Sequence, residues 1–297
     1  MANLKEVRNR IASVQSTQQI TKAMKMVSAA KLKRATNAII ALRPYATKLK
    51  EILGNLSASL EGSSSPFIQE REPNKVLIVT VSSNRGLAGA FNMNVIKAAN
   101  NLIAEKYSEQ LKNGNVSIIS IGKKTQDFYE KRKYNVIGNN NEIFSALTFE
   151  NVTKITDAIM AGFVKGEFDK VEVVYNRFRN AAVQFITTEQ LLPLPKAETV
   201  AETKTEKKTT NVDYILEPSQ EEIVEQLIPK SIKIQLYKAV LDSHASEHGA
   251  RMTSMDKATE NAGELLKALK LSYNQARQAA ITTELTEIVS GAAALEG

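Results

Sequence analysis

The sequence predicts a long antiparallel coiled coil, formed by an N-terminal and a C-terminal helix, with an open α/β domain inserted between them. Two observations predict this fold class. Each end of the chain repeats apolar residues at the heptad spacing of coiled-coil helices, and the middle alternates short β-branched runs with helical patterns. Neither end helix can bury its apolar seam alone, so the two helices are expected to pair once the chain has returned from the inserted domain.

The N-terminal helix is expected within residues 1–60, where a heptad seam persists over eight heptads. A helix of this kind would have up to about 57 residues and a length of roughly 85 Å. Pro44 conflicts with it, because an interior proline removes a hydrogen bond and costs about 3 kcal/mol, so we expect a kink or a break near Arg43. The seam consists of Leu4, Val7, Ile11, Val14, Gln18, Thr21, Lys25, Ser28, Leu32, Ala35, Ile39, Leu42, Ala46, Leu49, Leu53, Leu56 and Leu60.

Within this helix, four consecutive seam positions are polar, and a second apolar stripe runs beside them. Two interpretations remain open: a rotated packing contact in the same coiled coil, or a second partner that meets this face. The polar seam positions are Gln18, Thr21, Lys25 and Ser28, and the second stripe consists of Ile20, Ala23, Met24 and Val27.

The middle of the chain, residues 74–195, follows a linker at residues 61–73 that is rich in Ser, Gly and Pro. Its strand-helix-strand alternation predicts a Rossmann-like domain, an open and mainly parallel sheet with helices packed on it. Strands are expected at 75–81, 116–122 and 170–178 and in the segment ended by Pro193 and Pro195, and helices at about 91–112 and 149–165.

The last third of the chain begins with a variable linker or insert at residues 196–218. Residues 196–213 alternate acids, lysines and threonines without an aromatic, which indicates a disordered segment or a mobile loop. The C-terminal helix is expected within residues 219–297, with an interruption at Pro229. Its heptad phase slips by one residue ahead of Ile281, Leu285 and Ile288, and its end is poor in charge.

Composition restricts the classes of function. The net charge is +7, and residues 1–50 carry eleven Lys or Arg against the single acid Glu6, a field that favours an acidic partner. The absence of cysteine excludes disulfides and thiol catalysis. No run of about 18 apolar residues occurs and the N-terminus has no basic-then-apolar pattern, so we expect neither a membrane-spanning helix nor a secretion signal.

Two short motifs point to chemistry, and each has a structural alternative. SSNRGLAGAFN, residues 82–92, lies where a phosphate-binding loop would lie, but its G-x-x-G spacing lacks the P-loop lysine, which favours a tight strand-to-helix turn over a nucleotide site. His244, Glu247 and His248 fit the H-x-x-E-H zinc-protease pattern, and equally fit polar positions on a coiled coil. No nucleophile or carboxylate pair stands out, which favours a mechanical or binding role.

Three stretches together resemble the gamma subunit of the F-type rotary ATP synthase: residues 11–35, residues 82–92 and residues 250–295. The order of long helix, α/β domain and long helix is also the plan of that family. The resemblance implies a non-catalytic, cofactor-free central rotor stalk, which couples transmembrane proton flow to ATP synthesis or hydrolysis in a ring of alpha and beta subunits. The alanine-rich C-terminal end would then be the slim tip of a shaft inside that ring.

The resemblance also implies contacts residue by residue. Met24, Lys25, Lys31, Lys33 and Arg34 would face acidic segments of the beta subunits, and Arg251 would act with the N-terminal methionine in coupling. Tyr214 and Glu217 would lie in the foot that meets the epsilon subunit and the membrane rotor ring. A further cluster that contacts a loop of the ring would consist of Arg277, Gln278, Thr282 and Glu284, joined by Arg8.

The implied location is peripheral, at the cytoplasmic face of the bacterial plasma membrane, with membrane contact only through the complex and without nucleic acid. Photosynthetic relatives carry a regulatory cysteine pair in the linker, and this chain has no cysteine. Two other functions are considered. One is a basic coiled-coil protein that binds nucleic acid through residues 5–50, where Tyr45 is the one aromatic available for stacking. The other is a zinc hydrolase at His244 and His248.

Overall fold

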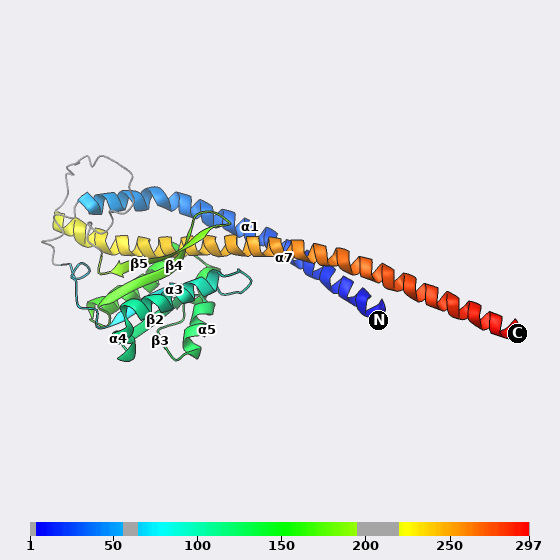
Figure 1. The fold of residues 1–297 in the computed structure, drawn as a ribbon. Coiled ribbons are helices and arrows are strands. Elements are labelled where there is room, and N and C mark those ends of the chain that lie inside the picture. Colours follow the sequence, from blue (N-terminus) through cyan, green and yellow to red (C-terminus); the bar gives the residue numbers. More distant parts are fainter. Residues whose placement is uncertain (1–3, 56–64, 195–219, 297) are drawn as a thin grey trace. The chain divides into compact units, whose positions relative to one another are not determined.

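The computed structural model describes residues 4–55, 65–194 and 220–296 (Figure 1). It confirms the predicted fold class. A long N-terminal helix, α1 (Leu4–Asn55), and a long C-terminal helix, α7 (Gln220–Glu296), enclose in the sequence a domain with one mixed sheet. None of the helices over these ranges combines the length and the apolarity that crossing a bilayer requires.

The sheet has five strands in the order β3-β2-β1-β4-β5. The first four of these run parallel to their neighbours, and β5 pairs antiparallel with β4 as the second arm of a hairpin. The predicted strands are therefore present, and the sheet is mainly parallel as expected. The strands are β1 (Val76–Val81), β2 (Val116–Ile121), β3 (Asn135–Val136), β4 (Lys170–Phe178) and β5 (Gln184–Leu192).

The helices of this domain depart from prediction in two places. The expected helix at about 91–112 is divided at Tyr107, whose buried hydroxyl donates a hydrogen bond to the carboxylate of Glu172. The helices are α3 (Phe91–Lys106), α4 (Ser108–Lys112), α5 (Lys123–Lys131) and α6 (Phe149–Val164), with a 3-10 turn η1 at Asn141–Ser145. The helix α5 and the strand β3 were not predicted, because α5 is short and mostly polar and β3 has two residues.

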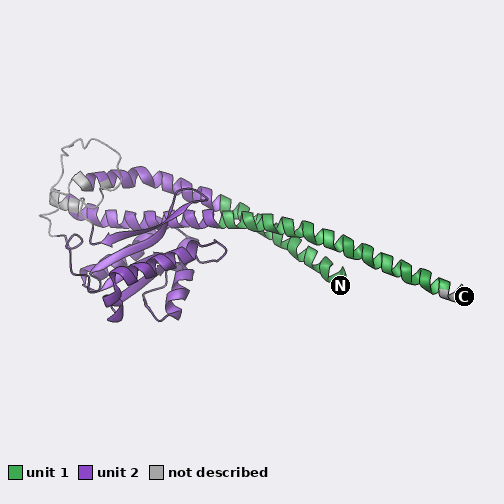
Figure 2. Cartoon of the chain, viewed as in Figure 1, with its two compact units in different colours: residues 1–29, 251–297 green, residues 30–250 purple. Residues whose placement is uncertain are grey.

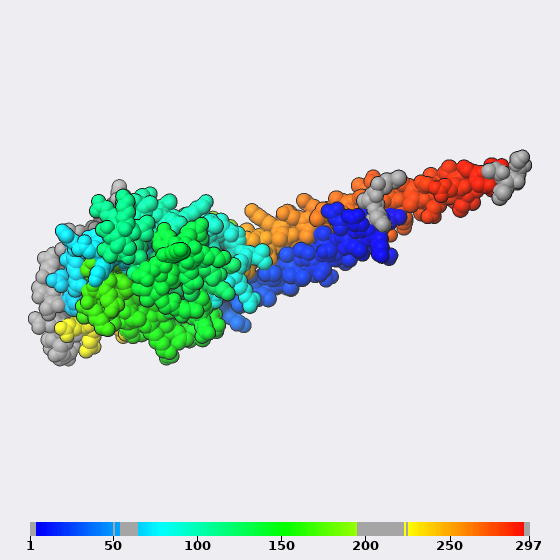
Figure 3. Space-filling model, turned by 90° about the horizontal axis from the view of Figure 1, so that it is seen from below, coloured from blue at the N-terminus to red at the C-terminus, as the bar shows by residue number. Residues whose placement is uncertain are grey.

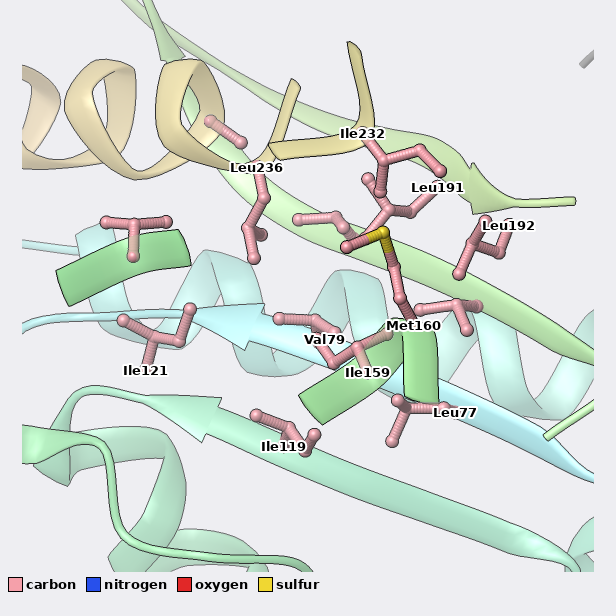
Figure 4. Close-up of a cluster of buried hydrophobic side chains, with 14 of the residues drawn as sticks. Leu77, Val79, Ile119, Ile121, Ile159, Met160, Leu191, Leu192, Ile232 and Leu236 are labelled. Atoms are coloured by element: carbon pink, nitrogen blue, oxygen red, sulfur yellow. The ribbon is translucent and has the colours of Figure 1, made fainter. Parts of the chain in front are cut away.

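The central strand β1 is buried on both faces, as expected of a parallel strand that helices cover on both sides. Leu77 and Val79 point into a cluster with α6 and α7, which supply Ile159 and Ile232 among others (Figure 4). Ile78 points to the opposite face, where α3 and α5 complete a second cluster. The N-terminal part of α7 is therefore part of the core of the α/β domain.

Of the kink or break expected near Arg43, the break is wrong, and the interruption expected at Pro229 is also wrong. Pro44 lies inside the continuous helix α1, and Pro229 lies inside the continuous helix α7. Each proline still lacks its backbone N–H, but buried side chains anchor the helix on either side of it. These side chains are Ile39 and Leu49 around Pro44, and Ile228 and Ile232 around Pro229.

The chain divides into two compact units (Figure 2). Unit 1 comprises residues 1–29 and 251–297, and unit 2 comprises residues 30–250, so each long helix contributes to both. This division groups residues by contact, whereas the five sequence segments at 1–60, 61–73, 74–195, 196–218 and 219–297 are a prediction about role. The whole of the predicted linker at 196–218 lies outside the described residues.

Candidate partner-binding surface

In unit 1, α1 and α7 pair antiparallel through polar seam residues. Thr21 and Ser28 are buried, and the hydroxyl of Thr259 donates a hydrogen bond of 2.8 Å to the hydroxyl of Thr21. One turn along the pair, Lys25 lies 2.5 Å from the carboxylate of Asp256. The polar seam residues of α1 therefore still face α7, as the apolar seam residues do.

The second apolar stripe of α1 consequently faces away from the seam. Ile20 and Val27 are 57% and 58% exposed, and Met24 between them is half-buried. A rotated packing contact within the coiled coil is thus the wrong interpretation of this stripe. Large apolar side chains exposed together are a mark of interaction surfaces. The stripe remains available for a second partner.

Basic residues continue along the same helix. Arg8, Lys31, Lys33 and Arg34 are exposed, while Lys25 is half-buried beside Asp256. Among the residues that the structure describes, no acid forms an ion pair with any of these four exposed residues. The surface of α1 therefore combines apolar side chains with positive charge, which suits a partner with both apolar and acidic groups.

The C-terminal end of α7 has no partner in the described part of unit 1. Thr21 of α1 lies opposite Thr259 of α7, and the two helices run antiparallel. Leu4, the first residue of α1, therefore lies opposite about residue 276, where the pairing ends. Every residue from 281 to 293 is exposed, and in Figures 1 and 3 the red end of α7 extends beyond the blue start of α1. The exposed apolar side chains there include Ile281, Leu285, Ile288 and Val289.

The predicted ring-contact cluster lies at the start of this unpaired segment. Arg277, Gln278, Thr282 and Glu284 are all exposed, and the Thr282 hydroxyl donates a hydrogen bond to the carbonyl of Gln278 at 2.9 Å. That bond is to the backbone within one helix, and the side chain of Gln278 is exposed. The four residues fall within eight positions of one helix, which places them on one short segment.

Arg251 differs from the other predicted contact residues, because it is only 7% exposed. It lies on α7 next to the boundary of the two units. Its side chain interacts with other groups of the chain, so it is part of the packing. Tyr214 and Glu217, predicted to lie in the foot, are outside the described residues.

The segment at residues 82–92 forms a strand-to-helix turn that binds its own polar groups. Asn92 accepts a hydrogen bond from the backbone N–H of Ser83 at 2.9 Å, and the Ser83 hydroxyl donates to the carbonyl of Arg85 at 2.6 Å. Asn84 accepts from the backbone N–H of Lys123 at 3.0 Å. These bonds support the interpretation as a structural turn, because the side chains that would face a phosphate are already engaged.

The histidines of the H-x-x-E-H pattern share one face of α7. Their Nε2 atoms are 3.1 Å apart, and the ring of His244 stacks on Phe144 with ring centroids 5.7 Å apart. Glu247, which lies between the two histidines in the sequence, is buried. Over the described ranges, no three His, Cys, Asp or Glu side chains are grouped so that they could hold a metal ion. The third ligand that a zinc hydrolase requires is therefore not supplied by those residues.

Sequence reasoning missed one cluster of charged residues. Arg43 entered it as part of the N-terminal charge and as the position of the expected kink or break, and Arg177 and Arg179 were not singled out. The structure brings the three together at one hollow with Phe178 and Phe185. The two-residue spacing between Arg177, near the end of β4, and Arg179, just beyond it, was the one local signal, but the approach of Arg43 depends on tertiary packing.

The chain is similar to ATP synthase proteins in sequence and in fold. A family model described as ATP synthase matches residues 3–295. Over 99% of both chains, the sequence is 56% identical to the ATP synthase gamma chain of Cytophaga hutchinsonii. It is 57% identical to that of Flavobacterium psychrophilum over the full length of both.

Two solved structures share the fold. One, from the central stalk and c-ring of the Tetrahymena thermophila mitochondrial ATP synthase, has a TM-score of 0.58 and 24% identity, and covers 80% of this chain and 99% of that one. The other, from the F1 and c-ring assembly of the Euglena gracilis mitochondrial ATP synthase, has a TM-score of 0.63 and 19% identity, and covers 98% and 94%. At these identities the two structures show a shared fold.

Proposed function

This chain belongs to the ATP synthase gamma-chain family and is the central stalk of an F-type ATP synthase. We propose that this stalk turns within a ring of three alpha-beta pairs. Rotation of the stalk would couple proton flow across the membrane to ATP synthesis, and ATP hydrolysis would drive the reverse rotation. The observation that carries this proposal is the unpaired apolar surface on α1 and at the end of α7, which unit 1 leaves uncovered.

We propose that the chain is not itself an enzyme and binds no cofactor, so that ATP chemistry belongs to the partner subunits. The stalk would act by differential contact, because it can shift a catalytic subunit only as far as its contacts favour one conformation of that subunit over another. One asymmetric stalk would therefore place the three catalytic interfaces in different states at any moment.

The proposed contact with the beta subunits combines two kinds of residue on α1. Met24 and its exposed apolar neighbours Ile20 and Val27 would pack on apolar side chains of the ring, and the exposed basic residues would face acidic segments. Arg251 would act with Met24 in coupling from a buried position in α7. The basic residues are Arg8, Lys25, Lys31, Lys33 and Arg34.

The end of α7 would enter the ring. Arg277, Gln278, Thr282 and Glu284 would contact a loop of the ring, and the exposed helix that follows would form the tip. A helix without an intramolecular partner gains little stability on its own, so a surrounding socket would stabilise it. The small side chains of residues 290–294 suit a narrow socket.

The foot would join the stalk to the epsilon subunit and to the membrane rotor ring, with Tyr214 and Glu217 among its contact residues. This part of the proposal rests on the family resemblance. It places the protein at the cytoplasmic face of the bacterial plasma membrane, where the chain would meet the membrane only through the complex and would bind no nucleic acid.

Reconstitution with alpha and beta subunits tests the proposal directly. We expect one copy of the chain per three alpha-beta pairs and restored ATPase activity, measured by mass determination of the complex and by phosphate release. The proposal is wrong if circular dichroism shows that the chain is folded and the chain still fails to join the ring.

The substitution Met24→Lys tests the proposed contact on α1. It adds charge to the exposed stripe without removing a buried seam residue, so we expect normal assembly but reduced proton pumping per ATP hydrolysed. Met93→Lys is the matched control, because Met93 is a half-exposed residue of α3 in the α/β domain. An unchanged ratio of pumping to hydrolysis in Met24→Lys would show that the contact is assigned to the wrong residue.

A further inference from the structure

A hollow in unit 2 is lined by three arginines. It has a volume of about 340 Å³, near the lower end of the roughly 300–1,000 Å³ typical of small-molecule sites. The residues that line it come from α1 and from the β4–β5 hairpin, and we call it the arginine pocket. They are Arg43, Arg177, Phe178, Arg179 and Phe185.

The hairpin aligns two of these arginines. Arg177 lies directly opposite Phe185 in the register of β4 and β5, so their side chains share a face of the hairpin. Arg179 lies just beyond the end of β4, and its guanidinium carbon lies 5.7 Å from the centre of the Phe185 ring. The ring of Phe185 therefore forms an apolar wall beside two positive groups.

The turn of the hairpin is held in place by its own hydrogen bonds. The side-chain oxygen of Asn180 accepts from the backbone N–H groups of Ala182 and Val183 at 3.0 and 2.7 Å. α7 approaches the turn closely, since a Cβ atom at Gly249 would lie 3.2 Å from the Cα of Ala181. Phe178 packs against the buried cluster formed by Ala35, Ile39, Leu241 and Ala245. The backbone that carries Arg177 and Arg179 is thus held in place, which lowers part of the entropic cost of binding.

The positive charge of the pocket is not neutralised by contact. Over the described ranges, none of the guanidinium groups of Arg43, Arg177 and Arg179 forms a hydrogen bond or an ion pair. The nearby acid Asp242 is buried on α7, and its pKa is raised to about 6 by that burial against the opposing effect of Lys238, Arg43 and Arg177. Of the three arginines, Arg43 and Arg177 act on Asp242, and Glu189 is a second carboxylate near it. With Lys238 and Arg179 counted as well, the basic groups outnumber the acids and a net positive field remains.

We propose that the arginine pocket binds a small phosphate-bearing anion. Guanidinium groups bind phosphate oxygens with paired hydrogen bonds, and three of them on two elements can surround a phosphate from several sides. Binding would also relieve the repulsion between the three like charges. The site lies in unit 2, between α1 and the β4–β5 hairpin, and shares no residue with the α1 stripe or the end of α7, so it is separate from the proposed ring contacts.

The test uses the purified full-length chain and inorganic pyrophosphate, titrated by isothermal calorimetry at low salt without divalent cations. We expect one binding site per chain, and we expect Arg177→Ala and Arg43→Ala each to weaken binding about tenfold or more. Arg132→Ala is the matched control. Arg132 is an exposed arginine that also lies over a phenylalanine ring, Phe128, but outside the pocket, so its loss should change the affinity less than twofold.

A second variant separates recognition from folding. Arg177→Lys keeps the charge but not the planar fork, so it should fold as the unaltered chain does by circular dichroism and still bind pyrophosphate several-fold more weakly. Three results would overturn the proposal. These are no binding to the unaltered chain, equal loss in Arg132→Ala and the pocket variants, or oligoglutamate displacing pyrophosphate with the same dependence on the three arginines, which would identify the ligand as an acidic peptide.

Discussion

At the residue scale, Asp242 shows how the domain treats a buried charge. It is 4% exposed, and burial raises its pKa from 3.8 to about 6. Lys238, Arg43 and Arg177 oppose the shift, and the carboxylate of Glu189 adds to it. Removal from water is the largest cause, so the protonated form of Asp242 is favoured in the folded chain relative to the unfolded chain.

This shift predicts a pH dependence of stability. Because the folded state holds the proton more tightly, the stability that Asp242 contributes is fully present below about pH 4 and is lost as the pH rises through about 6. A shift of about two units corresponds to about 3 kcal/mol. We therefore expect Asp242→Asn to gain about that much over the unaltered chain between pH 4 and pH 7, measured by urea unfolding. Parallel pH profiles of the two proteins would contradict this.

A second prediction at this scale concerns Gly122, which caps the end of β2. It has φ of +116°, and a Cβ atom there would lie 2.3 Å from the carbonyl oxygen of Ser82. Since that neighbour is backbone, Gly122→Ala should destabilise the chain by about 3 kcal/mol or more. Gly166→Ala, with φ of +76° and no atom within 4 Å, is the control and should cost about 1–2 kcal/mol. Equal losses in thermal unfolding would mean that the close approach does not matter.

At the element scale, the two long helices tolerate features that the helical pattern alone opposes. Pro44 is exposed on α1, and buried residues on both sides keep the helix continuous. The proline still costs free energy, because its N–H is missing and its ring clashes with the preceding turn. The burial of the residues on either side outweighs this cost. The polar seam is a second such feature, because a coiled-coil seam normally consists of apolar residues. The hydrogen bond from Thr259 to Thr21 satisfies the hydroxyl groups that are buried there.

We therefore expect Pro44→Ala to stabilise the isolated chain by about 1–3 kcal/mol, because it restores one hydrogen bond and removes a clash. Ala46→Gly, two residues away in the same helix, is the opposite control and should cost about 1 kcal/mol. Differential scanning calorimetry measures both changes. An unchanged unfolding temperature for Pro44→Ala would indicate that α1 bends enough there to absorb the proline.

At the scale of the whole molecule, the exposed end of α7 distinguishes residues that stabilise the chain from residues that serve a partner. Deleting residues 277–297 removes a segment that is exposed from residue 281 to residue 293. We expect the unfolding free energy of the isolated chain to change by less than about 0.5 kcal/mol, since surface residues without partners contribute little. The reconstituted complex should lose stability, measured by its thermal inactivation. A large loss in the isolated chain would show that the segment packs on the rest.

Much of the fold could be predicted because its signals are local. The heptad seam from Leu4 to Leu53 and the β-branched runs at β1, β2 and β4 depend on spacings of three to four residues and of two residues. The two missed elements, α5 and β3, are short, and neither carries enough apolar residues to show a period. The exposure of Arg277, Gln278, Thr282 and Glu284 does not follow from periodicity, because seam and non-seam residues alike are exposed where the pairing with α1 has ended.

By itself, then, the sequence determined the two long helices, the mainly parallel sheet between them and the family, because periodicity and motif are properties of neighbouring residues. Only the tertiary structure decided that Ile20 and Val27 face outward, that both prolines lie inside unbroken helices, and that Arg251 is buried. It alone brought Arg43 to Arg177 and Arg179. Those outcomes depend on which surfaces pack against one another over more than a hundred residues of sequence, and on burial energies that outweigh local preference.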